Sequence, residues 1–114
     1  MSNYSAMNQN DNQDFLLEIK HTALSVLDKG DSLFLYGSRA RGTSTSTSDW
    51  DLLIITKVRH SEDNAFDKYV FPLVLFGQQK EQAISVMVYS PKEWEKRKAT
   101  PFYQNVMNDR IRVL

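Results

Sequence analysis

The 114-residue chain contains no cysteine, which excludes disulfide scaffolds, thiolate zinc sites and cysteine nucleophiles. It has no excess charge either: 14 lysine and arginine residues balance 14 aspartate and glutamate residues. No bulk positive field would therefore hold an extended nucleic acid or an anionic membrane, although a local phosphate site remains compatible. No apolar run approaches the roughly 20 residues of a transmembrane helix, and the polar N-terminus is not a signal peptide. We expect a cytoplasmic protein.

What the chain does contain is typical of one small globular domain. Hydrophobic residues make up 41% and charged residues 25% of the sequence, which argues against general disorder. Residues 1–13 are polar and lack an apolar pattern, so we expect a disordered N-terminal tail. Residues 14–114 are expected to form a single domain.

The domain begins with a helical pattern. Apolar residues recur at helical spacing over residues 14–27, and Gly30 stands where the helix would end. Asp11 or Asn12 is expected to cap the N-terminus of this helix.

Three short apolar segments predict buried strands, at residues 32–36, 50–56 and 83–89. Between the last two strands, residues 61–77 have helical spacing, and Pro72 is expected to kink or split that helix.

Two further helix starts follow the third strand. Ser90 begins a capping-box sequence that ends at Glu93, and Thr100 precedes a proline at a helix start. The resulting order of alternating helices and strands predicts an α/β or α+β domain, with helices packed on a small sheet.

The segment after the first strand has the features of a phosphate site. Gly37 and Ser38 are expected to form a turn into a short helix, with Ser38 near the N-cap. Free backbone N–H groups and a hydroxyl at a helix start bind phosphate oxygens, and a glycine lets the ligand approach closely. Taken alone, the same residues also fit an ordinary capped turn.

Asp49 and Asp51 stand one residue apart at the start of the second strand. Their side chains should share one face, with Cα atoms about 6.5–7 Å apart, so both carboxylates can converge on one divalent ion. Oxygen ligands suit Mg²⁺, which also takes ligands from water and substrate phosphates. The alternative is a polar strand end with solvated aspartates. Carboxylates are poor strand formers, however, and adjacent negative charges repel unless a cation binds them.

Joined, the two motifs resemble the signature of the minimal nucleotidyltransferases, in the polymerase-β-like superfamily. The matching residues are Gly37, Ser38, Ala40, Gly42, Ser48, Asp49, Asp51 and Leu52. The resemblance covers roughly residues 14–98 and implies a nucleotidyltransferase-like fold, a small mixed β-sheet flanked by helices.

The resemblance also implies a site and its ligands. Mg²⁺ would be the metal, and ATP or another nucleoside triphosphate the substrate. Arg39 and Arg41 flank the turn, where each either clamps phosphate or lies on a solvated helix face. We assign metal binding and catalysis to Asp49 and Asp51, and nucleotide binding to Gly37, Ser38, Arg41 and Ser48.

One departure from the family pattern concerns a third carboxylate, which active members usually carry on the next core strand. Ser85 occupies the corresponding place by alternation, and a hydroxyl does not replace a carboxylate as a base. Glu81 shares the parity of Ser85 but lies about 13 Å away along an extended chain. Nucleotide binding is therefore better supported than catalysis.

The predicted reaction is transfer of a nucleoside monophosphate to a hydroxyl, with loss of pyrophosphate. Family resemblance implies a partner, a helical HEPN-type toxin that this chain would modify as its antitoxin. The alternative is a catalytically degenerate module that neutralises or scaffolds such a partner by docking. A third reading is a structural subunit whose glycine-serine turn is only a turn. The sequence leaves the oligomeric state and the base preference open.

Overall fold

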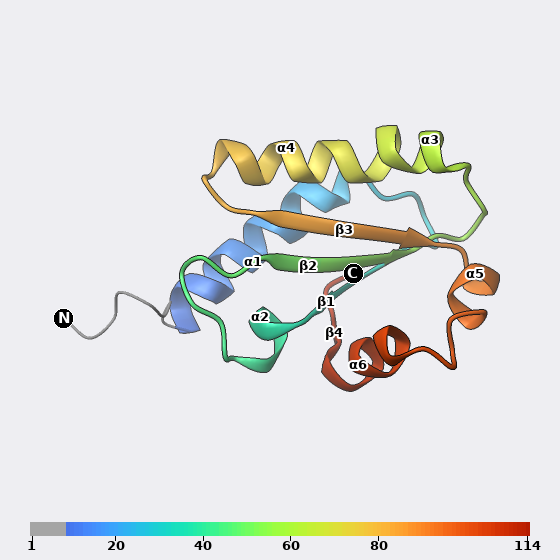
Figure 1. The fold of residues 1–114 in the computed structure, drawn as a ribbon. Helices are drawn as coiled ribbons and strands as arrows, with labels where there is room; N and C mark the ends of the chain where they lie inside the picture. The colour runs from blue at the N-terminus through green and yellow to red at the C-terminus, as the bar shows by residue number, and fades with distance from the viewer. Residues whose placement is uncertain (1–8) are drawn as a thin grey trace.

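The computed structural model describes residues 9–114, which form a four-stranded sheet with helices on both faces (Figure 1). The strand order is β3-β2-β1-β4. β1 (Ser32–Tyr36) runs antiparallel to β2 (Trp50–Ile55) and to β4 (Ile111–Arg112), whereas β2 and β3 (Ile84–Tyr89) are parallel. The small mixed sheet flanked by helices is confirmed.

Helices α1 (Gln9–Leu24) and α4 (Phe71–Gln79) pack on one face of the sheet and enclose the main core. This face of β2 carries Trp50 and the even-numbered apolar residues after it. None of the described helices is long and apolar enough to cross a membrane. The residues of this core with no exposed surface are Ile19, Ala23, Leu33, Leu52, Ile54, Tyr69 and Leu73.

Helices α5 (Pro91–Glu95) and α6 (Pro101–Asp109) cover the other face around Leu53. Their layer lies toward the C-terminal ends of β2 and β3 (Figure 1). At the start of these two strands, the same face is less covered: Asp51 and Ser85 are only partly buried. The short helix α2 (Ser38–Arg41) stands beside this open end, between β1 and β2 (Figure 1).

Helix α1 starts earlier than its sequence pattern predicts. It begins at Gln9, so residues 9–13 belong to the helix instead of the expected tail, and neither Asp11 nor Asn12 is its N-cap. Residues 1–8 of that tail lie outside the described residues. Asn12 contacts Arg39, a tertiary interaction between residues 27 positions apart that no local pattern reveals.

The helix that leads from β2 to β3 is divided, as Pro72 predicts. α3 (Glu62–Ala65) is followed by a π-helical turn, η1 (Phe66–Val70), and then by α4. Pro72 lies in the first turn of α4, directly after the π-helical turn. The capping box at Ser90 is also confirmed.

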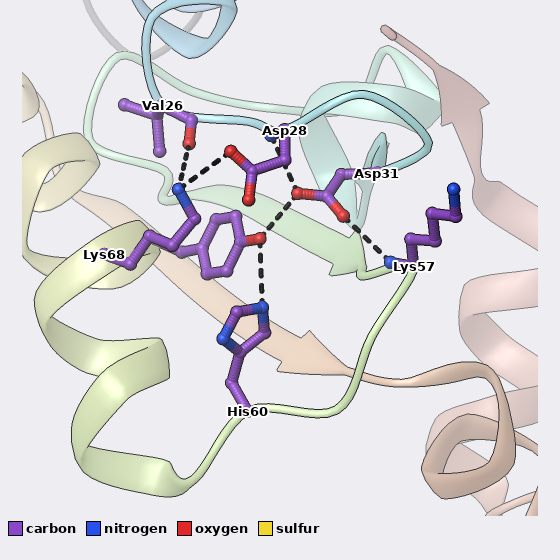
Figure 2. Close-up of polar contacts among 7 residues, drawn as sticks. Val26, Asp28, Asp31, Lys57, His60 and Lys68 are labelled. Carbon is purple, nitrogen blue, oxygen red and sulfur yellow. Dashed lines mark hydrogen bonds and ion pairs between the residues drawn. The ribbon is translucent and has the colours of Figure 1, made fainter.

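A polar cluster joins three segments at the opposite end of β1 and β2 from α2 (Figure 2). The Asp31 carboxylate accepts hydrogen bonds from the backbone N–H groups of Lys57 at 2.8 Å and Asp28 at 2.9 Å. The buried Tyr69 hydroxyl donates to the same carboxylate at 2.5 Å. These bonds fix the start of β1 and the end of β2 against η1, leaving the two strands in a defined register.

Removing the Tyr69 hydroxyl should make the free energy of unfolding less sensitive to a fall in pH. Burial opposes ionisation of Asp31, but the hydrogen bonds from Tyr69 and the two backbone groups outweigh it and lower the pKa of Asp31. The stabilisation is present above the unfolded-state pKa and is lost as pH falls through the folded-state pKa. Tyr69→Phe should cost about 1–3 kcal/mol in urea unfolding at neutral pH, and less in acid. Tyr103→Phe is the matched control, and an equal loss at both pH values would contradict this assignment.

Candidate active site

Gly37 makes the turn between β1 and α2. Its φ of 77° and ψ of −160° lie in a region that only glycine adopts readily. Its carbonyl accepts the N–H groups of Ala40 and Arg41 at 3.0 and 3.1 Å, which starts the helix. Gly37 itself is the N-cap and Ser38 is the first residue of the helix, so Ser38 stands near the cap as expected, although no side chain caps this helix.

A glycine is also required at position 37 because the Asp51 side chain leaves no room for a Cβ. β1 and β2 pair so that Tyr36 lies opposite Asp51, which brings the Asp51 side chain against the glycine. A Cβ built on Gly37 would collide with Oδ2 of Asp51. The structure therefore places the glycine turn directly beside one member of the predicted metal pair.

Asp49 and Asp51 lie at the start of β2, with the buried Trp50 between them pointing to the opposite face. Asp49 is exposed and Asp51 partly buried. Burial raises the pKa of Asp51, the charge of Asp49 raises it further, and Arg41 partly offsets both. The Asp51 carboxylate is thus an anion that a nearby cation would stabilise.

This donor set fits a hard divalent cation. Both candidate ligands are carboxylates, and such oxygen ligands are those that Mg²⁺ takes alongside water and phosphate. The described residues contain no group of three histidine, cysteine or acidic side chains that could hold a metal. Any cation held by Asp49 and Asp51 would therefore draw its remaining ligands from water and substrate.

A hydroxyl stands beside Asp51, at the position that the family resemblance assigned to a third carboxylate. Ser85 of β3 pairs with Asp51 of β2 in the parallel register and lies on the same face of the sheet. Glu81 stands in the turn before β3, with a φ of 57°.

Arg41 forms an ion pair with Asp109, the last residue of α6. Its guanidinium contacts the Asp109 carboxylate at 2.6 Å, with the Arg41 side chain 49% exposed. Arg41 also lowers the pKa of Asp51, so its charge reaches the acidic pair. To bind phosphate as expected, Arg41 would exchange Asp109 for the ligand.

Ser48 closes a turn in the loop before β2. Its Oγ accepts the backbone N–H of Thr45 at 2.9 Å and lies 3.2 Å from the Thr45 hydroxyl. Ser48 therefore shapes the approach to Asp49.

Arg39 was expected to clamp phosphate or to lie on a solvated helix face, and its burial contradicts the second alternative. It is 5% exposed and is held by Asn12, Ser44 and the carbonyl of Ser48. Its guanidinium carbon lies 4.5 Å from the centre of the Trp50 ring. An arginine two residues after a glycine turn gave no local sign of this burial.

Tyr36 is a residue of the site that the sequence did not single out. It lies opposite Asp51 on the same face of the sheet, with its ring edge-on to Phe102. Burial raises its pKa to about 12, with further contributions from the charges of Asp51 and Tyr89, so the phenol stays protonated at neutral pH. The only sequence signal was its place directly before Gly37.

The mixed sheet, the glycine turn and the Asp51 carboxylate beside it fit the nucleotidyltransferase-type domain that the sequence resemblance implies. The chain belongs to the nucleotidyltransferase domain family, whose model matches residues 17–113. Domains of this family generally use a nucleoside triphosphate and a divalent metal.

A solved structure described as "Crystal structure of the toxin-antitoxin with AMP-PNP" has the same fold, with a TM-score of 0.57. The two chains are 13% identical, and the match covers 94% of this chain and 73% of that one. No curated protein sequence matches this chain.

Proposed function

We propose that this chain binds a complex of Mg²⁺ with ATP, or with another nucleoside triphosphate, and transfers the nucleoside monophosphate to a hydroxyl on a partner protein. The observation that carries the proposal is the contact between the Gly37 turn and Asp51. This contact places a glycine backbone, which phosphate can approach closely, next to a carboxylate that a cation would stabilise.

Each residue has a distinct part in this proposal. Asp49 and Asp51 hold the cation, which when bound neutralises phosphate charge and orients the reacting groups. The backbone at Gly37 and Ser38 contacts the phosphate oxygens. Arg41 reaches the same oxygens from the side of α6, and Ser48 fixes the loop that delivers Asp49.

The reaction balances as a substitution at phosphorus. The acceptor hydroxyl oxygen bonds to the α-phosphorus while the bond from that phosphorus to the bridging oxygen breaks. Pyrophosphate leaves with the electron pair, and the hydroxyl proton passes to water or to a base. Because Ser85 stands where a carboxylate base would be, proton removal is the weak step for the isolated chain.

The proposed partner is a helical HEPN-type toxin, and the chain would act as its antitoxin. Two things support this: the family membership, and the likeness in fold to a chain from a toxin–antitoxin structure that was solved with a triphosphate analogue. In this proposal the partner brings the acceptor hydroxyl.

Calorimetry tests the binding half of this proposal. Titration of a non-hydrolysable ATP analogue into the chain should release heat in the presence of Mg²⁺ and much less in its absence. Absence of binding to any nucleoside triphosphate, with and without Mg²⁺, would contradict the proposal and favour a purely structural subunit.

A carboxylate at position 85 should increase the transfer rate. Ser85→Asp places an acid beside Asp51 on the neighbouring strand, and general-base help is worth typically about 10²–10⁴-fold. We expect the isolated wild-type chain to transfer slowly or undetectably, and the variant to gain at least about tenfold. Ser25→Asp, on the surface after α1, is the control. Rapid wild-type transfer that Ser85→Asp leaves unchanged would show that the base lies elsewhere.

The second candidate function is a docking antitoxin that needs no catalysis. The observation that favours it is the hydroxyl of Ser85 at the third-carboxylate position. In a toxin inhibition assay, a chain carrying both Asp49→Asn and Asp51→Asn would then neutralise the partner as well as the wild type. Loss of neutralisation by this well-folded variant would favour the enzyme instead.

A further inference from the structure

Arg39 is the most deeply buried charged side chain around the acidic pair, at 5% exposure. It lies in α2 and lines a cavity of about 430 Å³ together with Asn12 and Trp50. Burying a guanidinium is costly unless its donors are satisfied and its charge is balanced. The contacts of Arg39 therefore show which part of the fold its burial stabilises.

Those contacts converge on the segment that carries the two aspartates. One terminal nitrogen, Nη2, donates to the carbonyl oxygen of Ser48 at 2.8 Å, directly before Asp49. The guanidinium also lies 4.5 Å from the centre of the ring of Trp50, directly after Asp49. Arg39 thus holds the chain on both sides of Asp49.

The other end of the guanidinium is tied to α1. Nη1 donates to Oδ1 of Asn12 at 2.9 Å, and Asn12 in turn donates to the Ser44 hydroxyl at 3.3 Å. Arg39 itself lies 3.5 Å from that hydroxyl. The loop before β2 is therefore held at Ser44 by Asn12 of α1 and at Ser48 by Arg39, even though Asp49 is exposed.

We infer that Arg39 is a positioning residue that sets the divalent-cation affinity of the site by fixing Asp49. The inference rests on the proposed function, because it takes Asp49 and Asp51 as the cation ligands. Arg39 touches neither the cation nor the nucleotide. It acts through its contacts with the Ser48 carbonyl and the Trp50 ring, which fix the position of the Asp49 backbone relative to Asp51.

Lysine at this position keeps the positive charge but loses the planar fork and the stacking on Trp50. Groups that orient metal ligands typically change metal affinity by about 10–100-fold when they are removed. We therefore expect Arg39→Lys to weaken Mn²⁺ binding by at least about tenfold. Arg59→Lys, in an exposed pair with Glu93, is the matched control and should leave the affinity unchanged.

The experiment is a double-mutant cycle on Mn²⁺ affinity, measured by electron paramagnetic resonance with the metal alone and with a non-hydrolysable triphosphate. If Arg39 acts through Asp49, Arg39→Lys should lose its effect in an Asp49→Asn background. It should keep its effect in an Asp51→Asn background, where Asp49 remains. A general loosening of the fold would weaken binding equally in both backgrounds and would overturn the inference.

A milder variant keeps the test decisive if Arg39→Lys folds poorly. Asn12→Ala removes one partner of Arg39 from the side of α1, and it should weaken Mn²⁺ binding in the same background-dependent way, by about two- to fivefold. Tight Mn²⁺ binding by the wild type that neither variant changes would overturn the inference and leave the proposed function standing. No Mn²⁺ or metal–triphosphate binding by the wild type would instead overturn the proposed function itself.

Discussion

Replacing both Asp49 and Asp51 with asparagine is expected to abolish Mg²⁺-dependent triphosphate binding. Burial and the charge of Asp49 raise the pKa of Asp51, so keeping both carboxylates ionised costs free energy. A bound cation would offset that cost. Asparagine keeps the shape of each side chain but removes the negative charge that attracts the cation. Calorimetry with Mg²⁺ and a non-hydrolysable ATP analogue measures the loss.

The fold should survive this change, and Asp51→Asn alone should raise thermal stability at neutral pH. A carboxyl whose pKa is raised in the folded state destabilises the fold as pH rises from its unfolded-state pKa through its folded-state pKa. Asparagine removes that cost, so the gain should shrink in acid. Asp67→Asn, on the exposed surface of η1, is the control for both measurements. Undiminished Mg²⁺-dependent binding by the double variant would rule out this pair as the cation site.

Gly37→Ala or Gly37→Val is expected to lower triphosphate affinity by at least about tenfold and to destabilise the fold by about 1–3 kcal/mol. The backbone has a φ of 77°, and a Cβ there would push against Oδ2 of Asp51. A branched side chain would add bulk where phosphate approaches, so valine should have the larger effect. Both affinity and unfolding free energy can be measured on the same samples.

Gly42 provides a matched control for the backbone strain. It also has a φ of 77°, but a Cβ built there meets nothing within 4 Å. Gly42→Ala should therefore cost about 1 kcal/mol of stability and leave triphosphate affinity intact. Equal losses of affinity in the Gly37 and Gly42 variants would show that strain alone, not the approach to Asp51, explains the effect.

Local patterns in the sequence were enough to predict the three longer strands and the divided helix at Pro72. Each depends on neighbouring residues: apolar runs of strand length, or a proline without an N–H in a helical pattern. Strand alternation put Ser85 on the same face as Asp51, and the two residues pair in the structure. The resemblance to a known family, and not local spacing, joined the glycine turn and the aspartates into one motif.

The remaining features depend on contacts between distant residues. β4 has only two residues and exists because Ile111 and Arg112 pair with β1, far away in the sequence. The burial of Arg39 depends on Asn12 of α1 and on the ring of Trp50. The ion pair between Arg41 and Asp109 joins residues 68 positions apart. None of these partners could be chosen from spacing alone.

The central claim, transfer of a nucleoside monophosphate, is tested most directly by comparing two labelled forms of ATP. One carries the label at the α-phosphorus and the other at the γ-phosphorus, and each is incubated with the chain and a helical toxin partner before electrophoresis. We predict that protein is labelled only from the α-labelled form, and that labelling disappears with Asp49→Asn and Asp51→Asn together. Labelling from the γ-labelled form, or no labelling in any condition despite tight triphosphate binding, would contradict it.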